Sequence, residues 1–298
     1  MTSPGDSPYR IDKRAVRRAF ERAADSYEAA ALLQREVAGR LLERLDYIKL
    51  QPRTVLDAGC GTGYALAGLE RRYPQARLVA LDLALAMLRK IETRQGGWRR
   101  FLPGRDPLPE RVCGDLEHLP LARASVDLVW SNLTLQWCDD PGRVFAEVRR
   151  VLRPGGLFMF TTFGPDTLKE LRQAFAGVDG YVHVSRFIDM HDLGDALVRT
   201  GFTDPVMDME LITATYAEFG QILRDLKAIG AHNATEGRRR GLMGKNQWRE
   251  AQARYEALRR EGRLPATFEV VYGHAWQQAP RLSPGGRPVI EIRPPRPT

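Results

Sequence analysis

The 298-residue chain has little cysteine and no long apolar stretch. Its three cysteines, Cys60, Cys113 and Cys138, are too few and too scattered for a disulfide framework or a zinc cluster. The apolar stretches are far shorter than the roughly 20 residues that a membrane-spanning helix needs. Residues 1–10 carry no apolar core and do not resemble a signal peptide. We therefore expect a cytoplasmic protein with no metal site and no membrane contact.

The composition is that of an ordinary globular protein, with 43% apolar and 28% charged residues. The length permits one large α/β domain or two small ones. The net charge of +8 is unevenly distributed, because residues 234–298 hold 13 Arg or Lys against 6 Glu. A basic surface can attract nucleic acid, an acidic protein or an anionic small molecule. Charge alone does not choose among them.

Apolar positions recur at helical spacing over residues 12–47, which predicts an N-terminal helical lead (1–48) with a break near residues 25–26. In the following domain (49–278), short apolar runs alternate with helical segments, as is typical of a doubly wound, mostly parallel sheet. A basic helical insertion at about 216–262 precedes the last strand, and the Pro-rich residues 279–298 are expected to form a disordered tail. The expected strands are 54–56, 76–81, 111–113, 126–130, 157–161, 202–213 and 267–276.

The most informative segment, residues 55–63, reads VLDAGCGTG. A strand ends there, Gly59, Gly61 and Gly63 follow at every second position, and a helix begins. Glycines let the backbone approach a ligand closely, and open α/β sheets bind ligands at the carboxyl ends of their strands. The spacing does not match the dinucleotide motif G-x-G-x-x-G, because the sixth position from Gly59 is Tyr64. Asp57 would oppose a pyrophosphate and favour an ammonium or a sulfonium group.

Polar residues also follow the next strands. Asp82, followed by Leu83, ends the second strand, where an acid binds ribose hydroxyls in such folds. Asp115 follows the third strand and can meet an adenine amino group, with the backbone N–H of Leu116 beside it. Asn132 follows the fourth strand. A ligand with an ammonium group, a ribose and an adenine but no phosphate is S-adenosylmethionine, so we predict a site for this cofactor.

Longer segments resemble known proteins. LDAGCGTG, ALDLALAML and CGDLEHLPL are similar to the motifs of class I S-adenosylmethionine-dependent methyltransferases. VWSNLTLQW, TTFGPDTLKEL, HVSRFID and LKAIGAHN, with the helical lead, resemble the malonyl-[acyl-carrier protein] O-methyltransferases of biotin synthesis. The resemblance covers roughly residues 12–277. It implies a Rossmann-like seven-stranded sheet and methylation of the free carboxylate of a malonyl thioester to the methyl ester.

Such a reaction needs alignment and desolvation rather than a general base, because a carboxylate with a pKa of about 4 is already ionised at pH 7. Arg186 is our first candidate to position the carboxylate, since a guanidinium holds a carboxylate through two hydrogen bonds. Tyr27 matches a tyrosine in the N-terminal motif of the family. Lys227 and Asn233 lie at the start of the insertion and can line the same opening. The basic C-terminal quarter is expected to attract the acidic acyl carrier protein.

Three other functions stay open. A nucleic-acid methyltransferase would suit the basic charge, but SNLT follows the fourth strand in place of N/D-P-P-Y, and no RNA-binding module is appended. A mitochondrial assembly factor with a similar domain hydroxylates an arginine on a partner protein and shares segments like FGPDTLKEL, but it lacks the arginine that corresponds to Arg186. A non-catalytic binding module is the third, and the intact set of Asp57, Asp82 and the three glycines argues against it.

Overall fold

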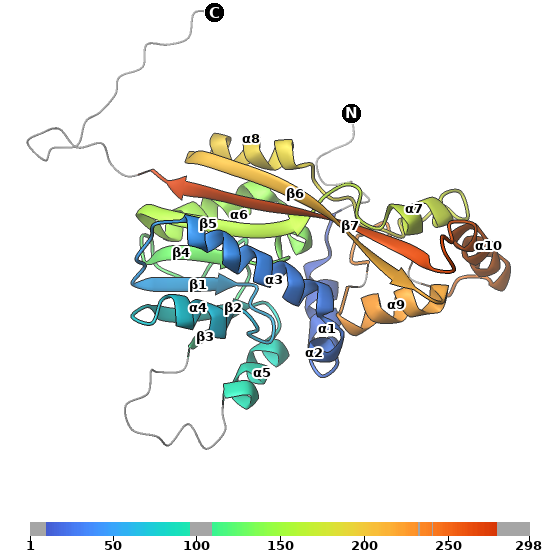
Figure 1. Ribbon diagram of the computed structural model, residues 1–298, viewed down its shortest axis with the longest axis horizontal. Coiled ribbons are helices and arrows are strands. Elements are labelled where there is room, and N and C mark those ends of the chain that lie inside the picture. Colours follow the sequence, from blue (N-terminus) through green and yellow to red (C-terminus); the bar gives the residue numbers. More distant parts are fainter. Residues whose placement is uncertain (1–9, 96–108, 232, 240, 279–298) are drawn as a thin grey trace, which may run out of the picture.

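The computed structural model describes residues 10–95, 109–231, 233–239 and 241–278 (Figure 1). Within these residues, seven strands form one sheet in the order β3-β2-β1-β4-β5-β7-β6. The strands β1 to β5 pair in parallel, whereas β7 is antiparallel to both β5 and β6. This confirms the predicted doubly wound, mostly parallel sheet. Its strands are β1 (Thr54–Ala58), β2 (Arg77–Asp82), β3 (Glu110–Cys113), β4 (Val126–Ser131), β5 (Leu152–Phe163), β6 (Phe202–Tyr216) and β7 (Leu264–Gln277).

Helices cover both faces of the sheet (Figure 1). The predicted break in the lead falls between α1 and α2. The insertion is less helical than expected, because α9 ends at Ala228 and α10 begins only at Lys245. The α1 helix begins at a capping residue, Asp12, whose carboxylate accepts a hydrogen bond from the N–H of Ala15 at 2.9 Å. The helices are α1 (Lys13–Ala23), α2 (Tyr27–Ala30), α3 (Leu32–Arg44), α4 (Leu66–Arg72), α5 (Leu85–Gln95), α6 (Pro141–Val151), α7 (Lys169–Phe175), α8 (Met190–Thr200), α9 (Phe219–Ala228) and α10 (Lys245–Glu256).

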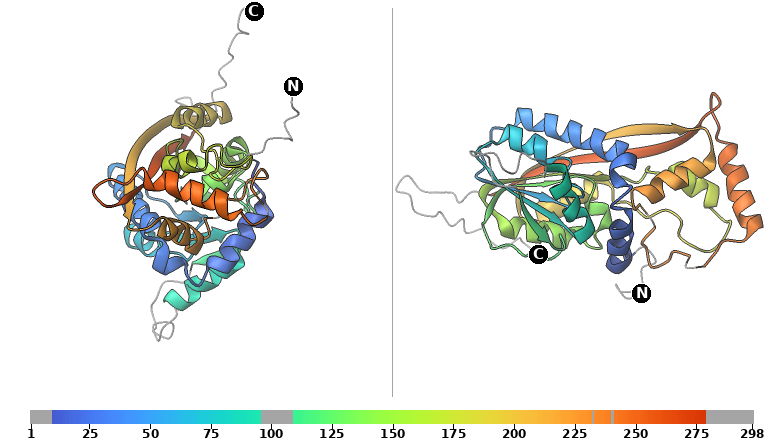
Figure 2. Two further views of the ribbon diagram at one scale, coloured as in Figure 1. Left: turned by 90° about the vertical axis from the view of Figure 1, so that its right-hand side faces the viewer. Right: turned by 90° about the horizontal axis from the view of Figure 1, so that it is seen from below.

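The apolar core has three main parts. One cluster buries Phe145 of α6 and Leu197 of α8 against the sheet, and a second includes Leu41 of α3 and Leu69 of α4. The long strands β6 and β7 run past the others, and α7, α9 and α10 gather around their far end (Figure 1, Figure 2). Tyr255 and its apolar neighbours form a third cluster there. The insertion is therefore a small helical unit anchored to the sheet through β6 and β7.

The N-terminal lead is tied to this insertion. Asp12 donates its N–H to the carbonyl of Ala234 at 2.8 Å, and its carboxylate forms an ion pair with Arg238 at 2.9 Å. Farther along the lead, the hydroxyl of Ser26 donates to the carbonyl of Ala228 at 2.9 Å. The lead and the insertion together enclose a space at the carboxyl ends of the parallel strands. No helix in the described part of the chain is long and apolar enough to cross a bilayer.

Candidate active site

The glycine-rich loop after β1 has the backbone shape that its sequence predicts. Gly59 and Gly61 have φ angles of +81° and +53°, in the region that side chains other than glycine rarely adopt. A β-carbon on Gly59 would lie 2.1 Å from Oγ1 of Thr134, whereas one on Gly61 would lie 3.7 Å from the ring of Tyr27. Close packing against the segment after β4 therefore requires glycine at position 59, and Gly61 faces the side chain of Tyr27 in the lead.

Asp82 holds the glycine loop from the end of β2. Its carboxylate accepts hydrogen bonds from the N–H groups of Gly61 at 2.9 Å and Ala84 at 2.8 Å. Burial raises the pKa of this carboxyl to about 6, although those N–H donors act in the opposite direction. Asp82 is thus ionised at neutral pH and lies in the wall of the cavity, as a ribose-binding acid must.

Asp57, unlike Asp82, has a carboxylate oxygen without a hydrogen-bond donor among the described residues. This oxygen is Oδ2, and the side chain is buried. Burial, with the nearby charge of Asp82, raises the pKa of this carboxyl to about 8. Asp57 does not itself line the cavity. A buried, unpartnered acceptor beside a second carboxylate fits a cationic ligand, so this observation agrees with a sulfonium cofactor.

The two predicted residues after β3 and β4 lie in the cavity wall with their polar groups already engaged. Asp115 accepts a hydrogen bond from Lys13 of α1 at 2.8 Å. The amide of Asn132 donates to the carbonyl of Gln34 in α3 at 3.0 Å and accepts a hydrogen bond from Thr161 at 2.8 Å. Both side chains therefore fasten the lead over the sheet. Further predicted residues that line the cavity are Leu83 and Leu116, whereas Gly63 packs beside α5.

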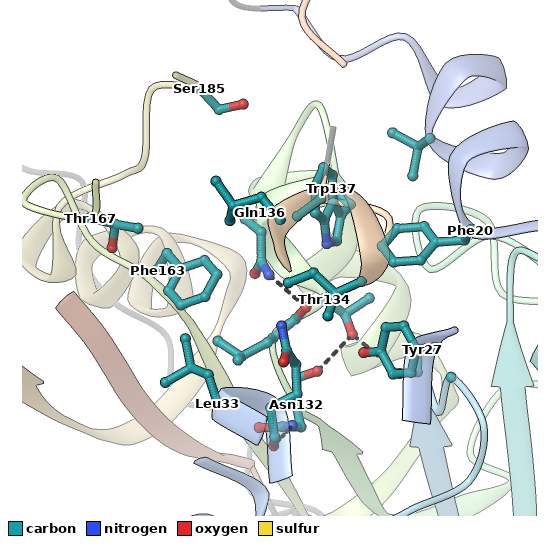
Figure 3. Close-up of a pocket in the computed structure, with 18 of the residues that line it drawn as sticks. Phe20, Tyr27, Leu33, Asn132, Thr134, Gln136, Trp137, Phe163, Thr167 and Ser185 are labelled. Atoms are coloured by element: carbon teal, nitrogen blue, oxygen red, sulfur yellow. Dashed lines mark hydrogen bonds between the residues drawn. The ribbon is translucent and has the colours of Figure 1, made fainter. Parts of the chain in front are cut away.

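The cavity has a volume of about 290 Å³ and continues from the glycine loop toward the insertion. Phe20 and Tyr27 project into it from the lead, opposite Thr134 and Trp137 (Figure 3). The rings of Phe20 and Trp137 meet edge to face at 5.3 Å. Burial, with the charge of Asp82, raises the pKa of Tyr27, so its hydroxyl stays protonated. The far part of the cavity is mostly apolar, with Leu33, Phe163, Leu168, Leu171, Phe187 and Phe268 in its wall.

The substrate residues predicted from the sequence are not all brought together. Arg186 is exposed and lines a neighbouring groove, although Ser185 and Phe187 on either side of it also line the cavity. Lys227 is exposed in a separate groove between α1 and α9. Asn233 lines the cavity, but its amide donates to the carbonyl of Val182, and its Oδ1 atom accepts hydrogen bonds from Thr235. Tyr27 is the one of the four candidates that lines the cavity with a polar group still available for a substrate. Its hydroxyl makes no hydrogen bond to another described residue.

Several wall residues were not predicted from the sequence. Thr134 and Gln136 follow β4 within the segment NLTLQW, so their position after a strand was a usable signal. Lys13 comes from the lead, and nothing in its local sequence singles it out. His183 lies in a loop and pairs with Asp179 at 2.8 Å, a contact that depends on the fold of residues 176–189.

Comparisons with known proteins agree with this geometry. The family model described as "Methyltransferase domain" matches residues 56–160. The fold resembles that of a S-adenosylmethionine-dependent methyltransferase from Thermotoga maritima, with a TM-score of 0.51 and 17% identity over 88% of this chain and all of the other. The sheet order and the glycine loop, with its two carboxylates, thus define a class I S-adenosylmethionine-dependent methyltransferase.

Curated relatives narrow the class. A malonyl-[acyl-carrier protein] O-methyltransferase of Gallionella capsiferriformans is 56% identical over 94% of this chain and 96% of the relative. One of Nitrosospira multiformis is 59% identical over 92% of each chain. The chain belongs to the malonyl-[acyl-carrier protein] O-methyltransferase family.

Proposed function

We propose that the protein methylates the free carboxylate of malonyl-acyl carrier protein, giving the methyl ester that biotin synthesis uses. The observation that carries this proposal is the cavity that joins the glycine loop, Asp82 and the hydroxyl of Tyr27 to a mostly apolar chamber. The family membership supports the same reaction. We also propose that the protein acts in the cytoplasm.

The residues of the cavity suit methyl transfer to an anion. S-adenosylmethionine, when bound, supplies a methyl group whose bond to sulfur breaks as the carboxylate oxygen forms a bond to carbon. Asp82 and the glycine loop would hold the cofactor, and the lead and insertion would exclude water from the carboxylate, which makes it a better nucleophile. Tyr27 would donate its hydroxyl proton in a hydrogen bond that aligns one carboxylate oxygen. The ionised carboxylate needs no base to remove a proton.

Arg186 is proposed to bind the second carboxylate oxygen. Its neighbours Ser185 and Phe187 already line the cavity, so a turn of the 176–189 loop would carry the guanidinium from the adjoining groove to the substrate. Asn233 would act by shaping the wall, because its amide holds the carbonyl of Val182 in that loop. Lys227 is exposed in a separate groove, so we do not propose that it contacts the substrate inside the chamber.

We further propose that the basic C-terminal quarter attracts the acidic carrier protein over a distance. Several of its arginines also pair locally, as Arg238 does with Asp12, Arg254 with Glu250 and Arg259 with Glu256, so part of the charge is neutralised at short range. Long-range attraction depends on net charge and is screened by salt. We expect kcat/KM for the carrier substrate to fall as salt rises from about 50 to about 300 mM, and an unchanged value would remove this role.

A pair of glycine substitutions tests the cofactor site. Gly61→Val would strain a φ of +53° and place a side chain against Tyr27, and should abolish binding of S-adenosylmethionine in calorimetry. Gly155→Val is the matched control, because its φ of +80° is equally unfavourable while a β-carbon there meets nothing within 4 Å. Normal cofactor affinity in Gly61→Val would show that this loop is not the binding site.

A further inference from the structure

The outer face of α1 and α9 carries a row of exposed cations. Arg14, Arg18 and Arg22 are four residues apart on α1, so their side chains share one face of the helix, and all three are exposed. Arg224 and Lys227 are exposed on α9. Within the described residues, none of these five side chains takes part in a salt bridge or a hydrogen bond. We call this set the α1–α9 face.

The two helices meet along a groove that joins their cations. Arg22 lines it from α1, and Arg224 and Lys227 line it from α9. The helices approach closely, since a β-carbon on Gly230, just after α9, would lie 3.1 Å from the ring of Phe20. The views of Figure 1 and Figure 2 also place α9 beside the lead.

The same helices form the cavity wall on their inner side. Val16 and Phe20 of α1, with Leu226 of α9, line the cavity. The α1–α9 face and the cavity are therefore separated by about one helix diameter, roughly 10 Å. A macromolecule that rests on this face lies about one helix diameter from the chamber.

Among the described residues, nearby acids leave most of the positive charge of this face uncompensated, although Arg18 is close enough to help lower the pKa of the Asp12 carboxyl, which pairs with Arg238. Asp25 pairs with Lys90 of α5, and Asp225 lines the cavity. Glu21 is 3.8 Å from Arg17, but its carboxylate also accepts hydrogen bonds from the N–H groups at the start of α5. As far as the described residues show, the α1–α9 face differs in this respect from the part of the C-terminal quarter up to residue 278, where Arg238, Arg239, Arg254 and Arg259 form ion pairs.

We propose that the α1–α9 face is the contact surface for the acidic side of the acyl carrier protein, while the C-terminal quarter contributes long-range attraction only. The proposal rests on the proposed function, since it places the carrier of that same substrate. Opposite charge selects the partner and speeds its encounter, and the position above the cavity wall directs the thioester-linked group inward. Lys227, predicted from the sequence to contact the substrate, would contact the carrier in this arrangement.

A charge-reversal triple tests the contact. The test variant combines Arg18→Glu, Arg22→Glu and Arg224→Glu, and the matched control combines Arg71→Glu, Arg123→Glu and Arg199→Glu, which are exposed arginines of α4, the segment before β4 and α8. Both triples change the net charge equally. Affinity for fluorescently labelled malonyl-acyl carrier protein, measured by anisotropy at low salt, should fall at least about tenfold in the test variant and about twofold or less in the control. Affinity for S-adenosylmethionine should stay unchanged in both.

The outcomes are distinguishable. Carrier affinity within about twofold of the wild type in the test variant, or an equal loss in both triples, overturns the α1–α9 contact. If the test variant also loses cofactor affinity, the milder set Arg18→Gln, Arg22→Gln and Arg224→Gln replaces it, with an expected weakening of about threefold or more. Failure of the proposed function is recognised by a different readout. In that case the wild type does not methylate the malonyl group, whatever its affinity for the carrier.

Discussion

The replacement Asp57→Asn should make the cofactor-free protein more stable while it damages the site. A folded-state pKa above the usual value means that the folded protein binds this proton more tightly than the unfolded chain does. Stability therefore falls as pH rises from about 3.8 to about 8, where the carboxyl is forced to ionise without a hydrogen-bond donor. At pH 7, about 3 pKa units above the unfolded value, the cost is at most about 4 kcal/mol. An amide at this position carries no charge, so the variant avoids this free-energy cost.

Chemical denaturation of both proteins at pH 5, 7 and 8 measures this difference. We expect the free energy of unfolding of Asp57→Asn to exceed that of the wild type by an amount that grows with pH. In the wild type, cofactor binding at pH 7 should also release close to one proton, because a cationic ligand favours the ionised form of a group with a pKa of about 8. Calorimetry in buffers of different ionisation enthalpy reports that proton. A less stable variant at pH 7, or no proton release, would refute the reasoning about Asp57.

Three further predictions concern the substrate and the cavity wall. Tyr27→Phe should bind S-adenosylmethionine normally and lower kcat about tenfold to a hundredfold, since one aligning hydrogen bond is lost; unchanged turnover in a labelled-methyl assay would remove Tyr27 from substrate positioning. Arg186→Ala should also keep cofactor affinity and reduce kcat/KM strongly, and a change of about threefold or less would place the second carboxylate contact elsewhere. Asn132→Ala should lower the free energy of unfolding by about 1–3 kcal/mol, because the carbonyl of Gln34 and the hydroxyl of Thr161 lose their partner; denaturation measures the loss, and an unchanged stability would contradict a fastening role.

The sheet and the cofactor side of the site could be predicted from local pattern. Each parallel strand is a short apolar run bounded by turn residues, and the ends of such strands lie at one edge of the sheet. Gly59, Asp82, Asp115 and Asn132 lie at the carboxyl ends of strands or within two residues of them, so their positions along the chain predicted that they would lie near the site. The antiparallel pairing of β7 with β5 and β6 has no such local signature, and the sequence did not lead us to predict it.

The substrate side depends on contacts between distant segments. The wall formed by Phe20 and Trp137 joins residues more than a hundred positions apart, and spacing within one helix cannot reveal which ring it meets. Arg186 illustrates the same limit, because its residue type suits a carboxylate while the loop that carries it turns the side chain toward the adjoining groove. Asn132 shows a further limit of sequence-based prediction, since a polar residue after a strand can form a structural hydrogen bond to the N-terminal lead instead of contacting a ligand.

The most direct test is transfer of labelled methyl from S-adenosylmethionine to malonyl-acyl carrier protein, with malonyl-coenzyme A, acetyl-acyl carrier protein and bulk tRNA in parallel reactions. We predict label in a base-labile methyl ester on the malonyl carrier and none on the acetyl carrier, which has no free carboxylate. Label in tRNA, or no transfer to any malonyl thioester by protein that binds the cofactor, would contradict the proposed function.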